Sequence, residues 1–340
     1  MLENNFLEKL LKGEHLTIDE ADGLLNAIAS NQINEMMAAG ILIALRMKGE
    51  HANEVAGFSK AMRSLSVNPE IKAQGKTIDI VGTGGDGSKS LNLSTGSALL
   101  AAACGLKVIK HGNRSISSSC GSADVLEKIG FPINQAPSKN QPVLNAIGFT
   151  FLYAPNYHPA MKSIAPIRKS LATRTIFNIL GPLVNPYNVS HLMIGAFSSP
   201  VAELMADSIQ ALPIQKAAII HSENGWDEAT PICPFELIMV SPGESNIKEI
   251  IDPKELGLEP CSANDLAGSD PTDNCERLKN ALNNKDSLHH RNALCLGAGI
   301  ALHLSGKVTT IKMGIDMAKS VLASGKAKTL VDQVRELDHV

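Results

Sequence analysis

A glycine-rich loop between an apolar strand and a helix constrains this chain most. Residues 78–81 read Ile-Asp-Ile-Val, and the loop Gly82–Gly87 (GTGGDG) and the turn Asn92–Thr95 (NLST) follow. Glycines let the backbone approach an anion closely, while a Ser-Thr pair can cap a helix whose free N–H groups favour negative charge. A basic segment, Lys110–Arg114 (KHGNR), ends the next apolar run. Together these features predict a phosphate-binding site.

Two commoner phosphate motifs fit the loop less well. The loop matches the dinucleotide pattern G-x-G-x-x-G, but that pattern expects an acidic residue about 20 positions later. Residues 99–110 contain no carboxylate. A Walker loop requires Gly-Lys-Ser/Thr, whereas here Ser88 separates Gly87 from Lys89. Nicotinamide, flavin and P-loop functions are therefore disfavoured.

The whole segment resembles the anthranilate phosphoribosyltransferase family in its glycine loop, its Asn-x-Ser-Thr turn and its Lys-His-Gly-Asn run. Further matching motifs follow in the same order: Gly121–Glu127 (GSADVLE), Ala154-Pro155, His158–Lys162 (HPAMK), Arg174–Asn178 (RTIFN), Leu180–Leu183 (LGPL), Asn185-Pro186, Asp227-Glu228 and Asn292-Ala293. Several independent motifs in one order are more specific than any single one. The resemblance implies transfer of the phosphoribosyl group of 5-phosphoribosyl 1-pyrophosphate to the amine of anthranilate, with release of pyrophosphate, in tryptophan biosynthesis.

Composition and charge exclude several other classes of protein. The 340 residues can bury a large core, and 31 basic against 34 acidic residues create no global field for nucleic acid or an anionic membrane. Six scattered cysteines without a C-x-x-C pair indicate free thiols in a reducing compartment. Residues 1–15 lack the order of a secretory signal, and no apolar run approaches a membrane span. We therefore expect a cytoplasmic protein.

Helical spacing dominates the first 70 residues, and strands begin after them. Thr17–Glu20 (TIDE) is a capping box, and Ile33–Met47 and Val55–Leu65 carry apolar residues three and four apart. Short β-branched runs then alternate with Ala-rich or Leu-rich helical stretches over Thr77–Val81, Leu99–Cys104, Lys107–Ile109 and Val125–Ile129. Further strands are predicted at Phe149–Tyr153, His191–Phe197, Ala217–His221 and Phe235–Val240, and closing helices that cover the sheet at Asn292–Leu304, Ile311–Leu322 and Lys326–Leu337.

This alternation indicates a parallel sheet covered on both faces. We predict an α/β fold with a small α-helical bundle lobe and a large α/β lobe, whose central, mostly parallel sheet is flanked by helices. The small lobe takes residues 1–73 and is joined by returning helices at about 163–187, and the large lobe takes residues 74–162 and 188–340. The resemblance implies the same layout, an active site in the cleft between the lobes, and a homodimer formed through the helical lobe.

The adjacent carboxylates Asp227 and Glu228 follow a predicted strand through a polar loop, where α/β sheets commonly place ligands. For such a pair alone a solvated acidic turn is the commoner explanation. Mg²⁺, however, usually takes one or two carboxylates plus substrate phosphates. The resemblance implies Mg²⁺ as the cofactor, two ions in number, held by Ser94, Asp227 and Glu228.

The other site residues are carried over from the matching motifs. The resemblance implies a phosphoribosyl-pyrophosphate site made of Gly82, Gly85, Asp86, Ser90, Asn92, Leu93, Ser94, Thr95, Lys110, His111, Gly112, Asn113, Arg114, Ser115, Ile116, Ser117, Ser118 and Cys120. It implies an anthranilate site made of Gly82, Asn113, Ala154, Pro155, Met161, Arg168 and Gly181. Lys110 alone has a simple physical function, since an ammonium neutralises a phosphate as a point charge.

Arg168 is chosen for the anthranilate carboxylate because a planar guanidinium can pair with a carboxylate bidentately. Lys169 and Arg174 lie close by, so residue type alone does not decide, and the alignment of the motifs selects Arg168. No general base is obvious, and His111 is the only candidate, because a neutral aromatic amine can attack before it loses its proton. The pair His289-His290 is dismissed as a zinc site, since adjacent helical residues point roughly 100° apart.

The chain departs from the family pattern before its GSAD motif. It reads Ser117–Cys120 (SSSC) where the family usually has Ser-Ser-Lys-Ser, so a lysine is missing and a thiol replaces a better donor. This difference bears on how tightly 5-phosphoribosyl 1-pyrophosphate, the phosphoribosyl donor, binds. Two alternatives are considered: a pyrimidine nucleoside phosphorylase, disfavoured by the glycine loop and the KHGN run, and a non-catalytic nucleic-acid-binding relative, disfavoured by the near-neutral charge and the Asp227-Glu228 pair.

Overall fold

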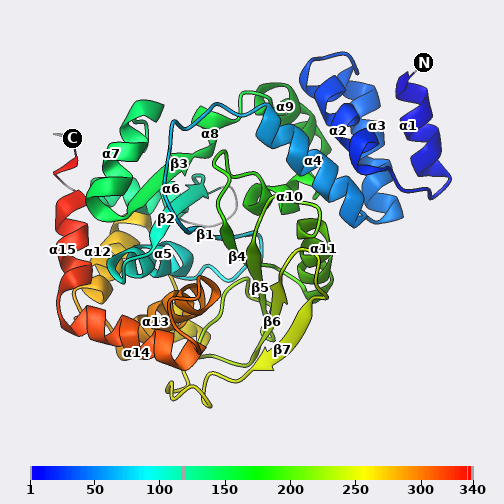
Figure 1. The fold of residues 1–340 in the computed structure, drawn as a ribbon. Helices are drawn as coiled ribbons and strands as arrows, with labels where there is room; N and C mark the ends of the chain where they lie inside the picture. The colour runs from blue at the N-terminus through cyan, green and yellow to red at the C-terminus, as the bar shows by residue number, and fades with distance from the viewer. Residues whose placement is uncertain (1, 116–119, 335, 338–340) are drawn as a thin grey trace.

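The computed structural model describes residues 2–115, 120–334 and 336–337. A group of helices at the N-terminal end stands beside a larger body built on one sheet (Figure 1). The N-terminal helices are α1 (Leu2–Leu11), α2 (Ile18–Ala29), α3 (Glu35–Lys48) and α4 (Ala52–Ser64). Helix α2 starts with the predicted capping box, in which the Thr17 hydroxyl accepts from the Glu20 N–H and the Glu20 carboxylate accepts from the Thr17 N–H.

The sheet has seven strands in the order β3-β2-β1-β4-β5-β6-β7. Its strands are β1 (Thr77–Gly82), β2 (Lys107–Gly112), β3 (Phe149–Tyr153), β4 (His191–Gly195), β5 (Lys216–Ser222), β6 (Phe235–Val240) and β7 (Ile247–Ile251). Strands β1 to β5 run parallel, and β6 and β7 run antiparallel to their neighbours. The chain leaves β1 toward β2 on one side, and β4 lies on its other side. Such a switch point opens a crevice at the carboxyl ends of the strands, where ligands bind in open α/β sheets.

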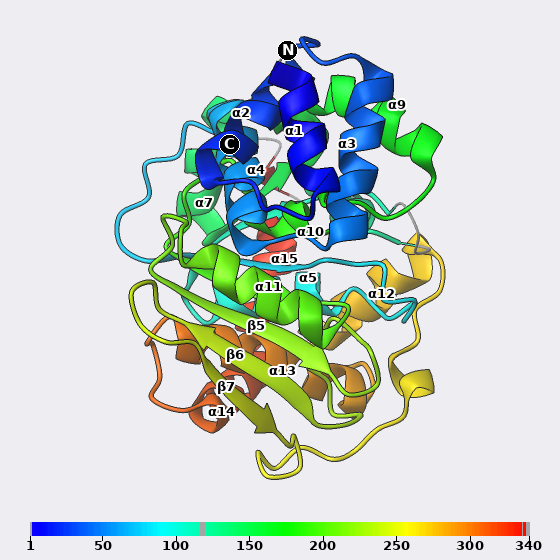
Figure 2. The same ribbon diagram turned by 90° about the vertical axis from the view of Figure 1, so that its right-hand side faces the viewer.

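Helices cover both faces of the sheet (Figure 2). One face packs against α5 (Leu93–Ala103) and α13 (Leu288–Leu304), with α14 (Ile311–Ala323) lying on α13 and α15 (Lys326–Val334) on α5. The same side carries α6 (Ser122–Ile129), α7 (Pro137–Ile147) and α12 (Pro271–Leu282). The other face packs against α11 (Ser199–Ile209), which also contacts α4 of the N-terminal bundle.

A middle segment of the chain returns to the N-terminal bundle. Its helices are α8 (Ala154–Tyr157), α9 (Met161–Leu171) and α10 (Phe177–Leu180), and the 3-10 turn Gly181–Leu183 follows. Helix α9 contacts α2 and α3, and α10 contacts α4. One apolar core therefore runs from the bundle through α9 and α10 to α11 and the sheet.

The predicted α/β class, with a helical bundle and a mostly parallel sheet flanked by helices, is confirmed. Every strand predicted from Thr77 to Val240 has a counterpart, although β2 extends three residues beyond the predicted Ile109 and so includes Lys110, His111 and Gly112. Strand β7 was not predicted, because this edge strand is mostly exposed and lacks the buried alternation that signals a strand. None of the helices in the described part of the chain has both the length and the apolar character to cross a bilayer.

Candidate active site at the carboxyl edge of the sheet

The loop after β5 brings Asp227 under the glycine loop. The Gly84 N–H donates to Asp227 Oδ2 at 2.7 Å, and the Asp227 N–H donates to Asp86 Oδ2 at 3.3 Å. A Cβ atom on Gly82 would lie 2.5 Å from Asp227 Oδ2, and one on Gly195 would lie 1.4 Å from the Asp227 carbonyl oxygen. The ends of β1 and β4 must therefore be glycine for this carboxylate to reach the loop.

Glu228 faces the start of helix α5. Its Oε1 accepts from the Ser94 N–H at 3.1 Å, and its Oε2 accepts from the Ser90 hydroxyl at 3.4 Å. The free N–H groups of a helix N-terminus attract anions, which explains why a carboxylate lies here. Asp227, Glu228, Ser94 and Ser90, predicted from separate motifs, thus lie together at one edge of the sheet.

The carboxylates at this edge repel one another in a buried environment. Burial, together with the charge of Asp86, raises the pKa of Asp227 to about 7. Burial and the charges of Asp227 and Asp86 raise the pKa of Glu228 well above its usual value. A divalent cation would relieve this repulsion, because buried like charges are costly without a counter-ion.

The donor set suits a cation that also binds substrate. Across residues 2–115, 120–334 and 336–337, no group of three or more His, Cys, Asp and Glu side chains forms a complete metal-binding cluster. Mg²⁺ commonly takes one or two protein carboxylates and fills its other positions with water and substrate phosphates. The residues present therefore fit Mg²⁺ bound together with a diphosphate, with Asp227 and Glu228 as the protein carboxylates.

Lys110 is buried between β1 and the carboxylates. Its ammonium donates to the Ile80 carbonyl oxygen in β1, the strand that leads into the glycine loop. Burial lowers the pKa of Lys110, while Asp79, Glu228 and Asp227 raise it. This ammonium is a positive charge close to the proposed metal ligands.

Asp79 replaces part of the β1–β2 ladder. Its carboxylate accepts from the His111 N–H at 3.2 and 3.3 Å and from Asn185 Nδ2 at 2.9 Å, and the same Nδ2 donates to the Ile109 carbonyl at 2.9 Å. The two strands therefore separate toward their carboxyl ends while their polar groups stay paired. Asp79 and Asn185 were named within the sequence motifs but neither was given a function, although a lone acid in the apolar run 78–81 was a signal.

His111 points toward the segment that returns to the bundle. Its Nδ1 lies 3.3 Å from the Gly181 carbonyl oxygen, and its Nε2 lies 3.2 Å from His158 Nε2. A carbonyl can only accept, so His111 carries its proton on Nδ1 when neutral. Burial lowers the pKa of His111 well below 6.5, followed by the influence of His158, so both rings are neutral near pH 7. His111, predicted for the phosphoribosyl-pyrophosphate site, and Gly181, predicted for the anthranilate site, are therefore neighbours.

The basic residues of 160–187 divide into two environments. Arg168 is half-buried in the last turn of α9, with its guanidinium carbon 5.6 Å from the Phe177 ring centroid. Arg174 instead donates to the Gly85 carbonyl at 2.5 Å and stacks over Phe197 at 4.2 Å. Arg46 of α3 donates to the Arg174 carbonyl at 2.7 Å. Arg174 thus links the bundle to the glycine loop, a contact that its position in the sequence did not reveal.

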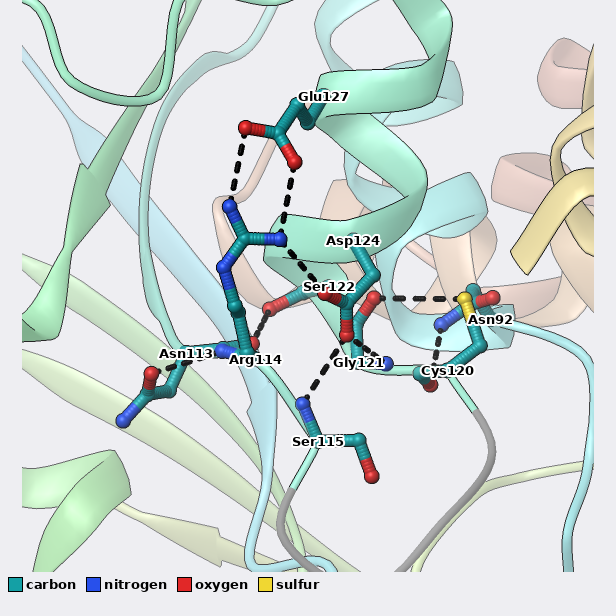
Figure 3. A network of polar contacts seen from close by, with 9 residues as sticks. All are labelled: Asn92, Asn113, Arg114, Ser115, Cys120, Gly121, Ser122, Asp124 and Glu127. Atoms are coloured by element: carbon teal, nitrogen blue, oxygen red, sulfur yellow. Dashed lines mark hydrogen bonds and ion pairs between the residues drawn. The ribbon is translucent and has the colours of Figure 1, made fainter. Parts of the chain in front are cut away.

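The segment after β2 is fixed to the start of α6. Arg114 pairs with Asp124 and Glu127 at 2.9 Å each, and the Ser115 N–H donates to Asp124 Oδ2 at 3.1 Å (Figure 3). The Ser122 hydroxyl donates to the Asn113 carbonyl at 3.2 Å. Arg114 is therefore held by two carboxylates. Asp124 and Ser122, which were not predicted as site residues, support residues 113–115, which were.

Other predicted residues lie at the starts of helices or in the core. Leu93 and Thr95 are buried within α5. Ala154 and Pro155 begin α8, and Met161 begins α9. Cys120 is buried and its carbonyl accepts from Asn92 Nδ2 at 3.1 Å. The predicted residues Ile116, Ser117 and Ser118, and the altered Ser119, lie outside the described residues.

Comparisons with known proteins agree with this geometry. Residues 4–66 match the family described as "Glycosyl transferase family, helical bundle domain", and residues 74–328 match "Glycosyl transferase family, a/b domain". The chain is 38% identical over 330 residues to the anthranilate phosphoribosyltransferase of Thermoanaerobacter sp. (strain X514), covering 97% of each chain. It is 40% identical over 325 residues to that of Thermosynechococcus vestitus, covering 95% of each.

Solved structures show the same similarity. The crystal structure of anthranilate phosphoribosyltransferase from Thermus thermophilus superposes with a TM-score of 0.91 at 35% identity, covering 98% of this chain and 99% of that one. The Saccharomyces cerevisiae enzyme in complex with PRPP and Mg superposes with a TM-score of 0.88 at 25% identity, covering 99% and 98%. By sequence over nearly its full length and by fold, this chain belongs to the anthranilate phosphoribosyltransferase family.

Proposed function

We propose that the chain transfers the phosphoribosyl group of 5-phosphoribosyl 1-pyrophosphate to the amine of anthranilate, with Mg²⁺ bound at Ser94, Asp227 and Glu228. The observation that carries this proposal is the meeting of the buried carboxylates with the glycine loop and the N-terminus of α5. The Saccharomyces cerevisiae relative has been crystallised with PRPP and Mg, and separately with 4-fluoroanthranilate. A site that binds two Mg²⁺ ions is part of the proposal.

The chemistry requires electrostatic stabilisation and positioning. Breaking the anomeric C–O bond leaves positive charge on the ribose and negative charge on the departing pyrophosphate. The N–H groups at the start of α5 and the Lys110 ammonium would stabilise the phosphates, and bound Mg²⁺ would neutralise the leaving group. The neutral amine of anthranilate then attacks the ribose carbon, so its orientation matters more than its deprotonation.

The acceptor would lie on the side of the returning segment. Arg168 would pair with the anthranilate carboxylate. Gly82, Asn113 and Gly181 would line the site. His111, in the basic segment Lys110–Arg114, already contacts the Gly181 carbonyl. Ala154, Pro155 and Met161 would contact the ring. His111 is the only candidate for a general base, but its lowered pKa and its contacts with Gly181 and His158 make it a weak proton acceptor, so the proposal does not depend on a base.

The proposal extends to the organisation of the molecule. We place the active site in the cleft between a helical lobe, residues 1–73 with returning helices at about 163–187, and the α/β lobe, and we expect the chain to act in the cytoplasm. The contacts of α9 with α2 and α3 support this division. An exposed apolar stripe on α3 supports a homodimer through the helical lobe, because Met36 is 85% and Met47 80% exposed and Ile43 lies between them on one helix face.

Anthranilate fluorescence provides the direct test. Mixing folded protein with anthranilate, the donor and Mg²⁺ should reduce the fluorescence at a rate that depends on Mg²⁺, and omission of the donor is the control. Absence of turnover by correctly folded protein would refute the proposal. Phosphorolysis of thymidine or uridine would instead indicate a nucleoside phosphorylase, and a salt-dependent DNA gel shift without transfer would indicate a nucleic-acid-binding relative.

A further inference from the structure

We propose that Asn274, in helix α12, is a positioning residue that sets the orientation of the Asn92 side-chain amide at the N-terminus of α5. Asn92 belongs to the proposed phosphoribosyl-pyrophosphate site, so this inference rests on the proposed function. Asn274 comes 182 residues after Asn92 in the chain and is 1% exposed. No motif in the sequence connects the two.

The orientation of Asn274 is fixed by a backbone donor. The Ser269 N–H donates to Asn274 Oδ1 at 2.7 Å, and an N–H group can only donate. The Nδ2 of Asn274 must therefore point the other way, where it donates to Asn92 Oδ1 at 3.2 Å. The neighbouring Gly268 has no room for a side chain, since its Cβ would lie 3.0 Å from Asn274 Nδ2 and 2.6 Å from the Ser90 carbonyl oxygen.

The orientation of Asn92 follows from that of Asn274. With its Oδ1 turned to Asn274, Asn92 presents Nδ2 to the Cys120 carbonyl at 3.1 Å (Figure 3). An amide nitrogen has two N–H bonds. The Cys120 carbonyl accepts one of them, and the Cys120 thiol also interacts with this amide, so a phosphate or ribose oxygen would accept an N–H in place of the weakly accepting sulfur. If Asn92 were reversed, two carbonyl oxygens would face each other and no donor would face the ligand.

The segment before α12 is attached to residues 89–91, which connect the glycine loop to α5. The Leu91 N–H donates to the Leu266 carbonyl at 2.9 Å, and the Gly268 N–H donates to the Lys89 carbonyl at 2.8 Å. These bonds place residues 266–269 along residues 89–91, so Ser269 and Asn274 are fixed relative to Asn92. The Cys120 thiol lies in the same network: burial raises its pKa to about 11, while Asn274 and Asn92 lower it, so the thiol is neutral. The structure therefore assigns to α12 a function in donor binding beyond packing.

The test compares an isosteric substitution with a truncation. Asn274→Ala removes the amide that orients Asn92, and Asn274→Asp keeps the acceptor for Ser269 but places a carboxylate oxygen against Asn92 Oδ1. We would measure the dissociation constant of the donor with Mg²⁺ by calorimetry, without anthranilate, and then KM for each substrate. Loss of one net hydrogen bond predicts about fivefold weaker donor binding for Asn274→Ala. Asn274→Asp should weaken it further, by more than about twentyfold, because the reversed amide also opposes Cys120.

Two controls distinguish positioning from packing. Asn280→Asp makes the same change on the same helix, outside this network, and should leave donor binding unchanged. In an Asn92→Ala background, Asn274→Ala and Asn274→Asp should have nearly equal and small effects on donor binding, because no amide remains to be oriented.

Three results would overturn the inference: an Asn274→Asp variant that binds donor as well as Asn274→Ala or better, effects that persist in the Asn92→Ala background, or an equal rise in KM for anthranilate. If Asn274→Asp does not fold, the Asn274→Ala and Asn92→Ala pair still decides through their non-additivity. Donor binding without transfer to anthranilate would refute the proposed function alone. Donor binding that is insensitive to Asn274 would refute this inference alone.

Discussion

At the scale of single residues, the site depends on acidic groups that are unfavourable without a cation. Asp227 is buried and accepts a hydrogen bond from the glycine loop, and Glu228 is half-buried and accepts one from α5. Their raised pKa values reflect burial first and repulsion by neighbouring carboxylates second, namely Asp86 for Asp227 and both Asp227 and Asp86 for Glu228. Binding of a cation would therefore relieve the repulsion between these carboxylates. Such repulsion is typical of sites that are completed by a metal ion together with its substrate.

Replacing both carboxylates should abolish Mg²⁺-dependent transfer while leaving the fold intact. Asp227→Asn with Glu228→Gln removes two negative ligands but keeps the shape of the side chains. We expect a loss of more than about a hundredfold in turnover at limiting Mg²⁺, measured by anthranilate fluorescence, with unchanged circular dichroism. Glu223→Gln, an exposed acid on the same loop, is the matched control. Unchanged activity of the double variant would remove the pair from the metal site.

The same pair should make the metal-free protein less stable as the pH rises. Asp227 has a pKa of about 7 when folded, against 3.8 ordinarily, so between these values the folded state binds more protons than the unfolded state. The contribution of Asp227 to the free energy of unfolding should then fall as pH rises from about 4 to about 7. Urea unfolding at pH 5 and pH 7.5 measures this, and Asp227→Asn should reduce the difference. A difference in stability between the two pH values that Asp227→Asn leaves unchanged would contradict the assignment.

Arg168 should serve the acceptor rather than the donor. Its guanidinium is half-buried against Phe177, and burial lowers its pKa. Loss of a charge-assisted pair predicts that Arg168→Ala raises KM for anthranilate by roughly tenfold to a hundredfold, with much less effect on KM for the donor. Lys169→Ala, its exposed neighbour, is the control. Equal increases in both KM values would indicate a structural arginine.

At the scale of elements, strand ends and helix starts position the site. Strands β1 and β4 end in glycines that leave space for Asp227, and α5 begins where Glu228 approaches. Strands β1 and β2 separate because Asp79 and Asn185 take over their hydrogen bonds. The crevice at the switch point is thus formed by particular side chains as well as by strand order.

Gly195→Ala should show how tightly β4 packs against the loop that carries Asp227 and Glu228. The new Cβ would lie 1.4 Å from the Asp227 carbonyl, so the loop must move. We expect a loss of roughly 1–3 kcal/mol in the free energy of unfolding and a higher Mg²⁺ concentration for half-maximal activity. Gly23→Ala provides the control, since nothing lies within 4 Å of its Cβ inside α2 and alanine favours a helix. Activity and stability like those of the unaltered protein would contradict this packing.

At the scale of the whole molecule, the bundle is connected to the sheet lobe by packing and by polar contacts. One core continues from the bundle through α9, α10 and α11, and Arg46 binds the backbone of Arg174, which in turn binds Gly85. The glycine loop therefore touches a residue that is held by the bundle. A movement of the helical bundle relative to the sheet would therefore displace Arg174 and, with it, the glycine loop.

Charges on the apolar stripe of α3 should disrupt the proposed homodimer. Met36→Lys with Met47→Lys places two cations on a face that a partner would cover, so light scattering should show half the mass of the unaltered protein. Met313→Lys, an exposed methionine on α14 of the other lobe, should leave the mass unchanged. An unaltered protein that is already monomeric would refute the dimer.

The amino-acid sequence alone determined the fold class, nearly every strand and the family. Strand and helix periods are local, and motifs such as GTGGDG, KHGN and Asp227-Glu228 keep their order and chemistry whatever surrounds them. Strand β7 escaped because an exposed edge strand has no buried face to give it a period.

Tertiary structure alone decided which distant residues support the motifs. Asp79 under His111, Arg174 on Gly85 and Asn274 beside Asn92 are contacts between segments that are far apart in the chain. The orientation of a buried amide or carboxylate depends on every donor around it, and those donors come together only when the sheet and helices pack. The residue types that carry the proposed reaction could therefore be recognised from local sequence motifs. The orientation of those residues depends on packing between distant segments.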